Sequence, residues 1–190
     1  MTIGLWTIII SVVGVGLFTA WAYRDWVARW DVDLFYGIPV RFDFGASQTP
    51  SLRMELAYAN EVITKAILEH YGEDPDLVLD LLDYWVEVVT PTNVYTPSVP
   101  QGKLPDGTPA AGSIRTERFM GIGPRHWVAV VSNENAGPLL IHEVLAHIVP
   151  AQVSGSASTH DLEGRYFDPK VKAIEYWAKG LLKELLHDDG

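Results

Sequence analysis

The sequence predicts an α+β domain, residues 31–190, that follows one N-terminal transmembrane helix and its juxtamembrane segment, residues 1–30. Three observations predict this class. Residues 3–22 form a long apolar run without a charge. Residues 34–44 and 126–132 have the aromatic and β-branched composition of strands. The remaining chain contains runs of helical spacing, several of which begin at a Thr-Pro or Asp-Pro pair.

The apolar run at 3–22 is long enough, at helical rise, to cross a hydrocarbon core about 30 Å thick. A buried core helix would show a polar stripe, and a cleavable signal peptide would carry basic residues before the run. The run shows neither feature. Aromatic residues suited to a membrane interface lie at both ends: Trp6, Trp21, Tyr23, Trp26 and Trp30. The sequence therefore predicts a single-pass membrane protein with lipid as a partner.

The charge of the chain excludes one class of partner. With 14 Lys and Arg against 24 Asp and Glu, the net charge is −10, which argues against nucleic acid. Arg24 and Arg29 follow the apolar run and favour a cytoplasmic domain, but Asp25 and Asp31 beside them leave the membrane side open. The chain has no cysteine, which excludes disulfides, thiolate metal ligands and cysteine nucleophiles.

Turn and cap residues predict the order of the remaining elements. One helix begins at Thr49-Pro50 and ends before Gly72, and a second begins at Asp74-Pro75 and runs through Trp85. Five prolines make 90–112 a long loop, and Pro150 is expected to end a helix. The elements expected after the loop are two strands at 113–120 and 126–132 and two helices at 139–148 and 168–186.

The residues that carry chemistry lie in the apolar helix expected at 139–148, which contains His142, Glu143 and His147. Burying three ionisable side chains is costly unless a partner satisfies them, and a divalent metal pairs with all of them at once. His-Glu-x-x-x-His resembles the His-Glu-x-x-His motif of the zincin metallopeptidases, in which an edge strand precedes the motif helix. The resemblance covers residues 113–177. The general layout of the chain is similar to that of small membrane-anchored or phage-encoded peptidases. It implies a zincin-like domain with a small sheet, an active-site helix and backing helices.

The resemblance also implies roles for these residues. In such a site His142 and His147 bind Zn²⁺, and the catalytic Glu143 takes a proton from the metal-activated water. A tetrahedral zinc ion needs a third protein ligand. We expect it from the polar loop after the helix, with His160 first and Asp161 next, as a ligand or as the acceptor of a histidine N–H. Glu175, on the last helix, is the alternative.

The motif is one residue longer than the motif of the zincins. In a regular α-helix, residues four apart lie about 40° apart around the axis, whereas residues five apart diverge by about 140°. A π-bulge would absorb the extra residue and bring His142 and His147 to one face. Alternatively, Glu143 and His147, which are four apart, are the ligand pair, or the site is inactive. The sequence leaves these three alternatives open.

Two further side chains and one strand have weaker functional interpretations. His126 is expected either at the surface or as a hydrogen-bond donor to an oxyanion. Tyr166 is expected either as a packed residue or as such a donor. The strand at 127–132 offers an edge for an extended peptide.

The sequence thus predicts a membrane-anchored, zinc-dependent peptidase that hydrolyses peptide or protein substrates. The alternative is a non-catalytic membrane or virion structural protein that keeps a degenerate zincin-like scaffold. A third reading is a metal-dependent hydrolase of other substrates.

Overall fold

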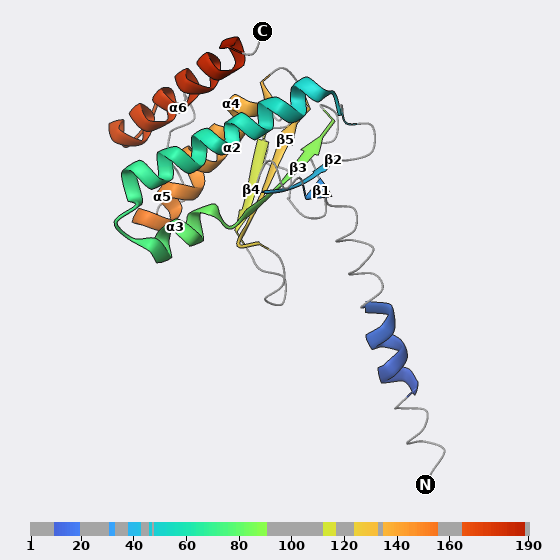
Figure 1. Ribbon diagram of the computed structural model, residues 1–190. Helices are drawn as coiled ribbons and strands as arrows, with labels where there is room; N and C mark the ends of the chain where they lie inside the picture. Colours follow the sequence, from blue (N-terminus) through green and yellow to red (C-terminus); the bar gives the residue numbers. More distant parts are fainter. Residues whose placement is uncertain are drawn as a thin grey trace. The chain divides into compact units, whose positions relative to one another are not determined.

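The computed structural model describes residues 10–19, 31–32, 38–42, 46, 48–90, 112–116, 124–132, 135–155 and 165–188 (Figure 1). The chain divides into two units, Met1–Asp31 and Val32–Gly190. In the first unit, residues 10–19 are helical. Residues 91–111 of the predicted loop lie outside the described residues, as do residues 34–37 and 43–44 of one predicted strand and 117–120 of another.

The predicted fold class is wrong in its N-terminal part. Within the described ranges, no helix is long and apolar enough to cross a membrane. The helix described inside the predicted span 3–22 covers residues 10–19, roughly 15 Å at helical rise. Residues 3–9 and 20–22 lie outside the described part of the chain. What the structure does describe is an α+β arrangement of a sheet and helices.

The sheet has five strands in the order β1-β2-β3-β5-β4. β2, β3 and β5 run parallel, and β4 is antiparallel to β5. In register, Val86 of β3 pairs with Val40 of β2 and with Val128 of β5. The strands are β1 (Asp31–Val32), β2 (Pro39–Phe42), β3 (Tyr84–Val89), β4 (Gly112–Thr116) and β5 (His126–Val131).

The helices that follow the predicted caps begin where expected. Thr49 Oγ1 accepts a hydrogen bond from Leu52 N at 3.3 Å, and Asp74 Oδ1 accepts one from Leu77 N at 3.1 Å. The helical segments are α2 (Pro50–Tyr71), α3 (Pro75–Leu82), α4 (Ala136–His142), the π-helical η1 (Glu143–Ile148), α5 (Val149–Ser154) and α6 (Pro169–Asp188).

The main core lies between the sheet and the helices. Tyr84, Val86 and Val88 of β3 form one buried cluster with residues of α2, α4, η1 and α6. Figure 1 shows these helices gathered on one side of the strands. Tyr84 is fully buried, and its hydroxyl donates to Asn60 Oδ1 of α2 at 2.5 Å. α4 and η1 contact β5, η1 also contacts β4, and α6 packs on α4 and η1.

Two predictions about the segments that form β3 and β5 are wrong. The second helix does not run through Trp85, because α3 ends at Leu82 and Asp83 leaves the helical region at ψ 68°. The residues that follow form β3, which is mostly buried on both faces and therefore lacks the alternation that marks a half-exposed strand. The segment 127–132 is not an edge either, because β5 lies between β3 and β4.

The helix expected at 139–148 is longer than predicted. It begins at Ala136, continues through Pro150 and ends at Ser154 before Gly155, whose φ of 70° stops the run. Pro150 is tolerated because it follows directly on the π-helical turn, where bonding five residues back gives way to bonding four residues back. The missing proline N–H falls at this change of bonding pattern.

Candidate metal centre

The motif lies where the helix widens. η1 spans Glu143–Ile148, and the N–H of Val149 donates to the carbonyl of Val144, five residues earlier. This is the π-type bonding that absorbs one extra residue per turn. Of the alternatives that the sequence leaves open, the π-bulge between His142 and His147 is thus the helix geometry that the structure has.

The widening brings the two imidazoles together. Nε2 of His142 lies 3.3 Å from Nε2 of His147, and the ring planes are perpendicular with centroids 5.0 Å apart. Both rings are partly exposed. Two ligands of a tetrahedral zinc ion, at Zn–N distances of about 2.0–2.1 Å, are about 3.3–3.4 Å from each other. The spacing of these two nitrogens thus fits one shared metal ion.

Glu175 of α6 determines which nitrogen of His142 faces His147. Its Oε1 lies 2.9 Å from Nδ1 of His142, and its side chain is 1% exposed. Because a carboxylate can only accept hydrogen bonds, Nδ1 is the donor, and in a neutral imidazole Nε2 then carries the lone pair. This is the arrangement in which a carboxylate orients a metal-binding histidine.

The carboxylate of Glu175 is held ionised by three donors. Burial alone would raise its pKa, but hydrogen bonds from His142, Lys179 and Tyr166 together lower the pKa to about 2. Lys179 Nζ lies 2.5 Å from Oε1, and the Tyr166 hydroxyl donates to Oε2. Tyr166 therefore supports Glu175, a role that the sequence did not predict. Glu175, predicted as an alternative ligand, contacts the nitrogen that points away from His147.

Glu143 lies on the same turn and is buried. Its side chain is 7% exposed and packs against Gly112 at the start of β4. Burial raises the pKa of Glu143 to about 7, with a further rise from Glu175 opposed by His142 and Lys179. A carboxyl group that titrates near neutral pH is suited to general acid–base catalysis.

The third ligand is not among the described residues. His160 and Asp161 both lie outside them. Among the residues that the structure does describe, no group of three or more His, Asp or Glu side chains is arranged to hold a metal ion. The described part of the centre thus consists of a histidine pair, its orienting carboxylate and the buried Glu143.

A cleft of about 530 Å³ opens beside this centre, between α4 and α6. Its lining includes His142, Glu175 and Lys179, together with two tyrosine side chains. The lining residues are Asn135, Pro138, Leu139, His142, Tyr166, Glu175, Tyr176 and Lys179.

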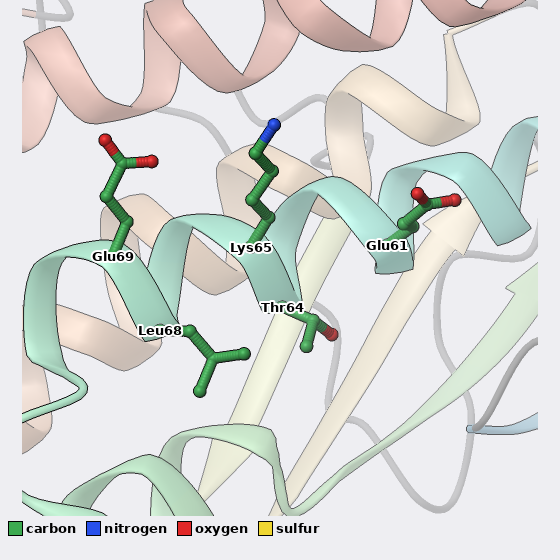
Figure 2. Close-up of a pocket in the computed structure, with 5 residues that line it drawn as sticks. All are labelled: Glu61, Thr64, Lys65, Leu68 and Glu69. Carbon is green, nitrogen blue, oxygen red and sulfur yellow. The ribbon is translucent and has the colours of Figure 1, made fainter.

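A second hollow, of about 590 Å³, lies along α2 and has a different character. Figure 2 shows that all five of its lining residues come from this one helix, with Leu68 directed away from Lys65 and Glu69. It contains no histidine, and we assign it no chemistry.

His126 takes neither of its expected positions. It is fully buried, and its Nδ1 lies 2.9 Å from Thr116 Oγ1. Burial and the nearby Arg125 lower its pKa to about 4, against smaller opposing effects of Asp83 and Asp80. It lies at the beginning of β5, whereas α4 follows the end of that strand. His126 is therefore a neutral packing residue and not part of the centre.

Comparisons of the chain with protein-family models, curated proteins and solved structures find no match.

Proposed function

We propose that this chain is a zinc-dependent peptidase whose metal ion is bound by His142 and His147. The observation that carries the proposal is the 3.3 Å separation of their Nε2 atoms, which the π-helical turn produces and Glu175 orients. π-bulges are found frequently at functional sites. The third ligand is proposed to be His160, with Asp161 as the second choice.

The proposed chemistry follows from the positions of the described side chains. Bound zinc supplies a Lewis acid that activates water and polarises a carbonyl. Glu143, on the same turn, takes the proton of the attacking water and later donates it to the leaving amine. Glu175 holds His142 in the orientation and tautomer that metal binding requires. Glu143 and Glu175 are both buried, whereas the two histidine rings are partly exposed.

The proposed peptide-binding strand is β4. β5 is paired on both sides, whereas in the described part of the sheet β4 is the last strand. An extended peptide can add to such a strand through main-chain hydrogen bonds. β4 contacts η1, and Gly112 at its start adjoins Glu143, so a peptide on this strand would pass near the proposed base.

Two substitutions separate the role of the ligand from the role of the base. Glu143→Gln keeps the shape of the side chain but removes the proton acceptor, so zinc should remain near one equivalent. Hydrolysis should then fall about 100-fold or more. His147→Ala removes a coordinating nitrogen and should lose zinc and activity together. The readouts are elemental analysis and turnover of a mixed peptide library.

Matched controls are available on α6. His187→Ala and Glu184→Gln change exposed side chains of the same types and should leave zinc content and turnover unchanged. Wild-type protein that is purified without chelators and holds no metal would contradict the proposal and favour the non-catalytic structural protein. Loss of zinc in Glu143→Gln would make Glu143 a ligand, and the base would then lie elsewhere.

A further inference from the structure

Gly112 lies in close contact with the side chain of the proposed base, Glu143. A β-carbon added at Gly112 would lie 2.5 Å from Oε1 of Glu143, 2.9 Å from its Cδ and 3.0 Å from its Cγ. Real β-carbons essentially never approach other heavy atoms to less than 3.0 Å. The carboxylate of Glu143 therefore occupies space that any other residue at position 112 would fill.

The backbone at Gly112 does not itself require glycine. Among the described residues, the glycine with a positive φ is Gly155. Gly112 begins β4 and pairs with Val130 of β5 in the antiparallel register. In an extended strand glycine is less favourable than alanine, because it loses more conformational freedom on folding. The need for glycine here thus arises from the contact with Glu143 and not from the chain conformation.

The part that would have to shift is the end of the Glu143 side chain, because the atoms that a β-carbon would meet are its Oε1, Cδ and Cγ. Gly112 is buried in the sheet and Glu143 is 7% exposed, so the carboxyl has little free space around it. Two carbon atoms pack at about 3.5–4.0 Å, so a β-carbon at position 112 would displace the Glu143 carboxyl by about 0.5–1 Å. A displacement of this size is large for a reacting group that must be positioned accurately, but small for the fold as a whole.

We propose that Gly112 is a positioning residue, whose missing side chain lets the edge strand β4 fix the Glu143 carboxylate in its working position. The catalytic part of this inference rests on the proposed peptidase function, whereas the steric part does not. The same strand would then hold the peptide and locate the base, so that the two are aligned through one backbone segment.

A double-mutant cycle on thermal unfolding tests the steric part without any activity. Gly112→Ala should lower the unfolding midpoint by about 3 °C or more in the wild-type background. In the Glu143→Ala background the space is empty, so the same change should leave the midpoint unchanged or raise it. Gly180→Ala, which meets no atom within 4 Å, is the matched control. Equal shifts in both Glu143 backgrounds would overturn the proposal.

Steady-state kinetics tests the catalytic part. Gly112→Ala should keep zinc near one equivalent and leave KM within about threefold of wild type, while kcat falls about 100-fold. Unchanged kcat in a folded, zinc-loaded variant would contradict a positioning role. If wild-type protein shows neither zinc nor hydrolysis, the proposed function fails, and the unfolding cycle still decides whether Gly112 positions Glu143.

Discussion

At the scale of single residues, the centre depends on side chains that act on one another before any ligand binds. Glu175 accepts from Nδ1 of His142 and so directs the Nε2 lone pair toward His147. Lys179 and Tyr166 in turn keep Glu175 ionised. The five-residue spacing of the histidines was visible in the sequence. The link from His142 to Glu175 was not, because the two are 33 residues apart and meet only when α6 packs on α4.

The role of Glu175 gives a prediction at this scale. Glu175→Gln keeps the size of the side chain but removes the charge that fixes the protonation of His142. We expect zinc affinity to fall about 10–100-fold, because groups that orient a metal-binding histidine have effects of this size. A competition titration with a zinc-sensitive chelating dye measures the change, with Glu184→Gln as the exposed control. An affinity within about threefold of wild type would show that Glu175 does not orient the ligand.

At the scale of elements, the π-helical turn reconciles the lengthened motif with one binding face. The caps of α2 and α3 were predictable because Thr49 and Asp74 act within a few residues of themselves. β3 was missed because burial on both faces removes the alternation that a strand normally shows in sequence. The order of the strands was not predictable either, because pairing in a sheet is set by tertiary contacts. The sequence therefore predicts a sheet edge at β5, whereas in the described sheet β4 is the last strand.

The π-helical turn predicts that one residue can be removed from it. Deleting Ala146 restores the four-residue histidine spacing and lets regular helical bonding replace the widened turn. Residues after it, including Ile148, then keep their orientation toward the core. We expect the variant to fold and to retain zinc. Its free energy of unfolding, measured by thermal unfolding, should fall by about 2 kcal/mol or less.

Deletion of Ala66 is the matched control, because this residue is equally buried but lies within the regular helix α2. There a deletion turns everything that follows by about 100° around the axis and should abolish the native unfolding transition. Similar losses for both deletions would mean that the turn at Glu143–Ile148 is not an inserted residue in an otherwise regular helix.

At the scale of the whole molecule, the sheet and helices bring distant segments to one place. β4 supplies Gly112, the helix after β5 supplies the motif, and α6 supplies Glu175 and Lys179. The sequence indicated the motif and its two histidines, but neither Gly112 nor the contact of Lys179 with Glu175. The central claim is that a single metal ion lies between the two histidines.

An anomalous-scattering map recorded at the zinc edge tests this claim most directly. The crystals should be of full-length protein purified without chelators and without added metal. We expect one peak about 2.0–2.1 Å from Nε2 of both His142 and His147, with a third protein ligand from the segment that contains His160. A map without a peak between these two nitrogens, or with the metal bound through Glu143 instead, would contradict a zinc site formed by His142 and His147.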